Sequence, residues 1–194
     1  MKKRSLLFFL GLFFYASCNY DQSTIALSEN KYYNIDSLLD AQVFLLTKSN
    51  AQLSKKVTLE EVILNMDSTD WSSALSVFRH LDLNKPSLND AYFVINNIAD
   101  SSSNLTILQY QLKDQNSHQR LKELRFYYLE SLKNIKKITA ESRSTSLIYS
   151  SKNIYELSFG QDQKQTTLKS YTIGLQQKTL FKDSVNSTIS FEII

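Results

Sequence analysis

The sequence contains very few of the residues that build phosphate loops and disulfides. Its 194 residues include three glycines, one proline and one cysteine. Only Gly160 and Gly174 follow the first eighteen residues, so a glycine-rich phosphate loop or dinucleotide fingerprint cannot be built there. A single cysteine excludes an intrachain disulfide, and a stable core must therefore come from apolar packing.

Histidine is equally scarce, which restricts metal binding and catalysis. His80 and His118 are the only two, and they do not form a His-Glu-x-x-His pair. A zinc site would need both of these distant side chains together with carboxylates. No Gly-x-Ser-x-Gly turn is present to support a serine nucleophile. We therefore expect no metal site, no cofactor and no catalytic residues.

Pairs of acidic residues are the main argument for an enzyme. Glu60/Glu61 and Asp67/Asp70 could in principle flank a glycosidic bond, as in a hydrolase acting on glycans or peptidoglycan. Acids beside turns and helix starts are more often capping groups and solvent-facing charges. The hydrolase is kept as the least favoured of three functional hypotheses.

The chain has no excess of one charge once its first residues are set aside. There are 22 basic and 19 acidic residues, and removing Lys2, Lys3 and Arg4 leaves 19 of each. Two later basic clusters are interleaved with Glu123 and Glu130, a pattern typical of solvated strand faces: Arg120, Lys122 and Arg125, then Lys133, Lys136 and Lys137. Nucleic-acid binding, which needs basic residues gathered on one face, is not expected.

The first eighteen residues have the layout of a secretory signal. Three cations precede an apolar run from Leu6 to Phe14, and small residues follow before Cys18. A helix of this nine-residue run would rise only about 14 Å, too little for a hydrocarbon core of roughly 30 Å. A membrane-spanning helix is therefore disfavoured.

The closing residues Tyr15-Ala16-Ser17-Cys18 resemble the lipobox of bacterial lipoproteins. The resemblance implies cleavage between Ser17 and Cys18 and lipidation of the Cys18 thiol by fatty acids such as palmitate. The alternative is an ordinary signal-peptidase site nearby that leaves a free cysteine. An unpaired thiol would be a liability in an oxidising compartment, so lipidation is favoured. Membrane contact is then expected through this anchor.

The implied organisation has three parts. Residues 1–17 form the signal peptide, residues 18–31 carry the acylated cysteine and a polar tether, and residues 32–194 form a single domain. Asp21 is the only acid close behind Cys18, whereas surface-exported lipoproteins of Bacteroidota-type bacteria often carry an acidic cluster there. The resemblance therefore favours an outer-membrane protein of the cell envelope that faces the periplasm.

Three later stretches also resemble Bacteroidota-type envelope lipoproteins of no known activity. They are Asp70-Trp71-x-x-Ala74-Leu75-x-x-Phe78, Asp82-Leu83-Asn84-Lys85-Pro86, and Tyr171-x-Ile173-Gly174-x-Gln176-x-Lys178. This resemblance supports localisation and architecture only.

Apolar spacing predicts a helix over residues 34–48, capped by Asn34 or Asp36. A strand is expected over residues 51–58. For Val62 to Met66 two interpretations remain open: a second short strand, or a helix opened by a capping box at Thr58 and Glu61.

A second helix is predicted after the capping residues 67–70. Trp71, Leu75, Phe78 and Leu81 form one apolar stripe, and the helix should end before Pro86. On such a stripe Trp71 is expected to anchor the core rather than to serve as a ligand platform.

From Tyr92 onward the apolar period changes to two, which predicts consecutive antiparallel strands. The expected strands cover residues 92–99, 105–113, 121–130, 135–142, 145–151, 154–159, 167–175 and 185–194. Short polar turns are expected between them, including Lys152-Asn153 and Lys182-Asp183-Ser184. The predicted class is α+β, with one or two N-terminal helices on a long, curved antiparallel meander that could partly close into a barrel.

These features favour a non-enzymatic binding protein of the envelope. The leading hypothesis is that its curved sheet holds an apolar or lipid-like ligand, in an arrangement that superficially resembles carriers of the lipoprotein-localisation type. This is an analogy of fold only. The alternative is a structural or interaction subunit of an envelope protein assembly, which predicts an exposed apolar patch.

Overall fold

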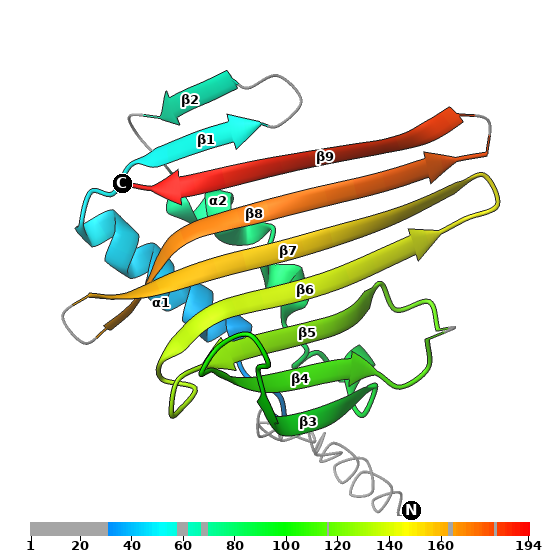
Figure 1. Ribbon diagram of the computed structural model, residues 1–194, viewed down its shortest axis with the longest axis horizontal. Coiled ribbons are helices and arrows are strands. Elements are labelled where there is room, and N and C mark those ends of the chain that lie inside the picture. The colour runs from blue at the N-terminus through cyan, green and yellow to red at the C-terminus, as the bar shows by residue number, and fades with distance from the viewer. Residues whose placement is uncertain (1–30, 58–61, 67–69, 116, 163–164, 181) are drawn as a thin grey trace, which may run out of the picture.

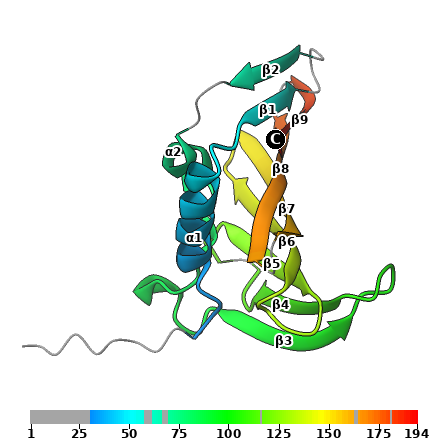
Figure 2. The ribbon, with the colours of Figure 1, turned by 90° about the vertical axis from the view of Figure 1, so that its left-hand side faces the viewer.

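The computed structural model describes residues 31–57, 62–66, 70–115, 117–162, 165–180 and 182–194. They form two layers, an antiparallel sheet and a helical layer on one of its faces (Figures 1 and 2). The predicted α+β class with helices on a long meander is confirmed. The sheet is open, with β2 at one edge and β3 at the other, so it does not close into a barrel.

The elements follow one another in a simple order. The helical segments are α1 (Ile35–Lys48), α2 (Trp71–Ser76) and the 3₁₀ turns η1 (Arg79–Leu81) and η2 (Pro86–Leu88). The strands are β1 (Leu53–Val57), β2 (Val62–Met66), β3 (Tyr92–Ala99), β4 (Thr106–Leu112), β5 (Leu121–Tyr128), β6 (Ile135–Thr145), β7 (Tyr149–Asp162), β8 (Gln165–Thr179) and β9 (Lys182–Ile193).

The nine strands lie in the order β2-β1-β9-β8-β7-β6-β5-β4-β3. From β3 to β9 each strand pairs with the next in the chain, because short connections join antiparallel neighbours. The exception is the early hairpin β1–β2, which adds to the far side of β9. Leu53 lies opposite Ile193, and Val57 lies opposite Ile189.

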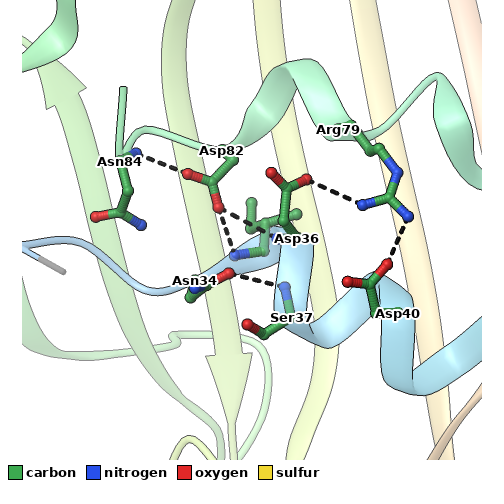
Figure 3. A network of polar contacts seen from close by, with 8 residues as sticks. Asn34, Asp36, Ser37, Asp40, Arg79, Asp82 and Asn84 are labelled. Atoms are coloured by element: carbon green, nitrogen blue, oxygen red, sulfur yellow. Dashed lines mark hydrogen bonds and ion pairs between the residues drawn. The ribbon is translucent and has the colours of Figure 1, made fainter. Parts of the chain in front are cut away.

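Helix α1 begins where the sequence predicts. Asn34 is its N-cap and accepts a hydrogen bond from the Ser37 amide at 2.7 Å (Figure 3). A second acceptor is the carboxylate of Asp82, the residue that follows η1, which is buried with 3% exposure. It accepts hydrogen bonds from the Ile35 amide at 2.9 Å and the Asp36 amide at 3.2 Å. Two side chains therefore satisfy amides that the first helical turn leaves unpaired.

The same carboxylate organises the segment that follows η1. Asp82 also accepts from the Asn84 amide at 2.7 Å, and Asn84 exchanges hydrogen bonds with the backbone of Tyr32. Across α1, Arg79 pairs with Asp36 and Asp40 (Figure 3). This polar network fixes η1 against the start of α1.

The second helix is shorter than predicted but its apolar stripe is correct. Trp71, Leu75, Phe78 and Leu81 are all buried, and Trp71 is a core residue as expected. The α-helix stops at Ser76 because the Phe78 and Leu81 amides bond to carbonyls three residues back, which tightens the chain into a 3₁₀ turn.

One buried amide side chain ties the helical layer to the sheet. Gln42 on α1 is 2% exposed; its Nε2 donates to the Thr166 carbonyl at 3.0 Å, and its Oε1 accepts from the Leu168 amide at 2.7 Å. The side chain therefore pairs with backbone groups of β8 much as a neighbouring strand would.

The structure decides between the two interpretations of the segment after β1. Val62–Met66 is a strand, β2, which pairs antiparallel with β1, so the helical alternative is wrong. Thr58 and Glu61, the proposed capping box, lie outside the described residues.

The strand predictions hold well up to β5 and fail in part beyond it. The separate strand expected over residues 145–151 does not exist, because β6 continues to Thr145 and β7 starts at Tyr149. Lys152-Asn153 lies inside β7, and Lys182-Asp183-Ser184 belongs to β9. Residues 145–153 are all exposed or partly exposed. Because no face of this segment is buried in the core, the pattern of polar and apolar residues does not distinguish a turn from a strand there.

Within the described part of the chain, no helix is long and apolar enough to cross a bilayer.

Candidate functional site

The space between the helices and the sheet is filled by side chains. Phe78 packs edge-on against Tyr171 and Tyr155, with ring centroids 5.3 and 6.2 Å away, and its side chain is completely buried. Leu39, Leu75, Leu124, Phe126, Ile138 and Leu157 are buried to the same degree. These side chains occupy the region in which the sequence-based hypothesis placed an apolar ligand.

A cleft opens where the helical cover ends. It has a volume of about 610 Å³ and lies between the α2–η1–η2 segment and strands β3, β6 and β7. The β4–β5 connection forms its remaining wall. Its lining residues are Ser76, Val77, His80, Lys85, Ser87, Leu88, Tyr92, His118, Gln119, Arg120, Leu121, Ser142, Asn153 and Tyr155.

The charges of the lining have one sign. Lys85 and Arg120 contribute cations, and no aspartate or glutamate is among the lining residues. His80 and His118, distant in the sequence, lie in the same cleft. A cleft with two cations, several hydroxyl and amide groups and no carboxylate favours an anionic ligand.

His80 is held at the cleft by an aromatic contact. Its ring lies 5.0 Å from the Tyr155 ring, centroid to centroid, at an interplanar angle of 65°. Partial burial lowers the pKa of His80, and the nearby Lys85 charge lowers it further, against a hydrogen bond with Val77 that raises it. His80 is therefore neutral near pH 7, where it can donate one hydrogen bond and accept another.

The wall that carries His118 and Arg120 is anchored at both ends. Lys122 Nζ donates to the carbonyls of Gln115 at 3.0 Å and Ser117 at 3.2 Å. The Arg143 amide donates to the Arg120 carbonyl at 2.9 Å, which fastens the end of the wall to β6. These bonds hold the Arg120 backbone while its side chain stays exposed to the cleft.

Two largely buried tyrosines, Tyr92 and Tyr155, form part of the cleft lining. Tyr92 donates its hydroxyl to the Leu121 carbonyl at 2.8 Å, and burial raises its pKa to about 12. The Tyr155 hydroxyl accepts from Asn153 Nδ2 at 3.3 Å. The Tyr92 phenol therefore remains neutral at physiological pH, and both rings form part of the cleft floor rather than protruding into it.

The cleft does not have the composition of a metal centre. Among the residues that the structure describes, no group of three or more His, Cys, Asp or Glu side chains could hold a metal ion. The two histidines lie beside cations, whereas zinc with two histidines would require anionic partners.

Of the two acidic pairs, the structure describes only Asp70. Asp70 caps α2, accepting from the amides of Ser72 and Ser73 and from the Ser73 hydroxyl at 2.6 Å. The Ser73 hydrogen bonds lower the pKa of Asp70. Glu60, Glu61 and Asp67 lie outside the described residues, as do Ser17 and Cys18 of the predicted cleavage and lipidation site.

Sequence reasoning missed most of this cleft. Lys85, Tyr92 and Tyr155 carried no local signal, and Arg120 was assigned to a solvated strand face, although it lines the cleft. The two scarce histidines are the only residues of the cleft that the sequence singles out, and their pattern there points only to metal binding.

No family model, no curated protein and no solved structure matches this chain.

Proposed function

We propose that the protein is a lipid-anchored binding protein of the bacterial cell envelope, attached through Cys18, whose cleft binds a small anionic ligand with a ring or short apolar part. The observation that carries the proposal is the cleft lining, which combines Lys85 and Arg120 with Tyr92 and Tyr155 and includes no carboxylate. The function is binding rather than catalysis, and the protein is placed at the outer membrane, facing the periplasm.

The packed core favours an amphiphilic ligand over the wholly apolar ligand that the sequence suggests. An acyl chain under the helices would have to displace Phe78 and its neighbours, and interiors of this density resist such displacement. The cleft beside them already exposes polar groups, the His80 ring and the Val77 side chain to solvent. An anionic head can meet Lys85 and Arg120 there while a ring lies against His80 and Val77.

Calorimetric titration with anilinonaphthalene sulfonate tests the cleft, because this probe joins a sulfonate to aromatic rings. Arg120→Gln should weaken binding by about tenfold or more, the effect of losing one charged hydrogen bond. Lys133→Gln makes the same change of charge at an exposed position outside the cleft and should leave affinity unchanged. Equal losses in both variants would show that the probe responds only to net charge.

The anchor is tested separately. We expect globomycin to block maturation, the mature N-terminal peptide to carry the mass of an acylated cysteine, and Cys18→Ser to release the protein from membranes. A mature protein with an unmodified N-terminal peptide would overturn the anchor and leave the cleft proposal standing.

A second candidate function is that of an interaction subunit in an envelope assembly. It is supported by strand β3 at the sheet edge, where Phe93, Val94 and Ile95 are 55%, 42% and 38% exposed. An edge strand with exposed apolar residues is a template for a partner strand. A photo-cross-linker at Val94 in intact cells should give a defined larger adduct, whereas one at Ser102 should not.

A further inference from the structure

Two neighbouring hairpins end in exposed aliphatic side chains. Leu147 and Ile148 lie between β6 and β7 and are 98% and 67% exposed, and Leu180 at the end of β8 is 64% exposed. We call these three residues the hairpin-tip patch. Ordinary turns carry polar residues or glycine, so bulky aliphatic side chains at two adjacent tips require a reason.

The patch is held as one unit. The Leu180 amide donates to the Ile148 carbonyl at 3.0 Å, which joins the two tips, and the Ser146 amide donates to the Tyr149 carbonyl at 2.7 Å. The backbone polar groups that these bonds use are satisfied within the protein. This matters at a membrane surface, where an unpaired amide would resist removal from water.

A polar groove lies directly behind the patch. It has a volume of about 580 Å³ and contains three cations, Arg143, Lys152 and Lys178, with no carboxylate in its lining. The strand register places its residues side by side: Arg143 is opposite Lys152, which is opposite Gln176. Ser150 and Lys178 line both the groove and the depression at the tips, so the two surfaces are continuous.

Glu141 neutralises part of this charge but not all of it. Its Oε1 pairs with Arg143 at 2.6 Å and its Oε2 with Lys152 at 2.9 Å. Lys178 forms no ion pair with any residue that the structure describes, and Asp183 is an exposed acid on the neighbouring strand. The groove therefore keeps an excess of positive charge next to the apolar tips.

From this juxtaposition we propose that the hairpin end docks on a phospholipid bilayer, with the hairpin-tip patch among the acyl chains and the cationic groove against the lipid phosphates. The order of side chains fits the depth profile of an interface: aliphatic residues outermost, then Tyr149, then cations. A protein partner would need pockets to receive these protruding tips, whereas a lipid surface adapts to them. The inference concerns a different surface from the proposed ligand cleft.

The test uses the full chain reconstituted into phosphatidylcholine vesicles that contain phosphatidylglycerol. Leu147→Trp adds an indole to the patch, and Ser102→Trp adds one in the β3–β4 connection, at the opposite end of the strands. Trp71 is buried in both and gives a common background. All variants share the same N-terminal anchor, so attachment alone produces no difference.

In Leu147→Trp we expect the added emission to shift to the blue on binding to vesicles and to be quenched when the phospholipid is brominated. In Ser102→Trp we expect neither change. Adding Ile148→Glu and Leu180→Glu should abolish the quenching, since both positions are exposed and tolerate charge without unfolding. Lys152→Gln with Lys178→Gln should remove the advantage of phosphatidylglycerol vesicles over phosphatidylcholine alone.

Equal quenching at positions 147 and 102 would overturn the proposal. So would a blue shift at position 147 without quenching by brominated lipid, together with a cross-linked dimer, because that result would assign the patch to a second copy of the chain. Unchanged phosphatidylglycerol dependence in the double lysine variant would overturn the role of the groove.

Discussion

The same strands run through two very different environments in this molecule. Beneath α1 and α2, strands β6 and β7 present Ile138 and Leu157 to a fully packed core. Farther along the same face, past the helices, they present the partly exposed Ser144 and Asn153 instead. The covered part therefore supplies stability, and the uncovered part supplies polar groups that can meet a ligand or a surface.

The largest expected difference between the two parts is in core packing. Phe78→Ala should lower the free energy of unfolding by about 3–5 kcal/mol, because a fully buried aromatic side chain leaves a cavity. Leu147→Ala removes an exposed side chain and should change stability by less than about 0.5 kcal/mol. Urea denaturation of both variants measures the contrast, and similar losses would refute the assignment of stability to the covered part.

The polar network at the start of α1 should come next. Asp82→Ala orphans the Ile35 and Asp36 amides and should cost about 2–4 kcal/mol. Asp40→Ala removes only an exposed partner of Arg79 and should cost under about 1 kcal/mol. Denaturation midpoints give the comparison, and Asp82→Asn, which keeps an acceptor, should recover part of the loss.

The attachment of α1 to β8 has a smaller expected effect. Gln42→Ala leaves the Thr166 carbonyl and the Leu168 amide without their side-chain partner and should cost about 1–3 kcal/mol. Gln111→Ala on the exposed face of β4 is the matched control and should be nearly neutral. Amide hydrogen exchange at Leu168 should accelerate in the first variant only; unchanged exchange would argue against the contact.

The smallest effect is the pH response at the boundary between the two parts. The pKa of His80 is lower when folded than its unfolded value of about 6.5. Between these two values the unfolded chain binds more protons, so stability falls as the pH decreases through this window. His80→Gln should flatten the change of Tm with pH, and Lys85→Gln should flatten it partly. An unaltered profile in His80→Gln would exclude this origin.

Much of the fold could be predicted because elements that bury one face have apolar residues at a regular spacing in the sequence. The stripe from Trp71 to Leu81 and the alternation of Leu124 and Phe126 in β5 each match one buried face. Past the helices this constraint disappears. A polar pair such as Lys152-Asn153 can lie in mid-strand there, and an apolar pair such as Leu147-Ile148 can lie in a turn. Neither placement changes which side chains are buried in the core.

The cleft could not be predicted from local sequence patterns, for a different reason. Lys85, Arg120 and Tyr155 come from separate elements, and only the pairing of distant strands places them around one space. Each residue taken alone reads as an ordinary surface or sheet position. The lipobox is the opposite case, a short local signal, and its prediction at Cys18 stays a prediction because those residues lie outside the described part.

The position of the β1–β2 hairpin has a consequence for the timing of folding. In the described sheet this hairpin pairs with one other strand, β9. Next to that pairing, the Gln52 amide donates to the Ile194 carbonyl at 2.9 Å and the Ile194 amide donates to the Gln52 carbonyl at 3.0 Å. The backbone groups of β1 on the β9 side are therefore paired only after residues more than 120 positions later in the sequence have folded. Since such distant pairing slows folding, completion of this edge of the sheet should be among the slower steps of folding.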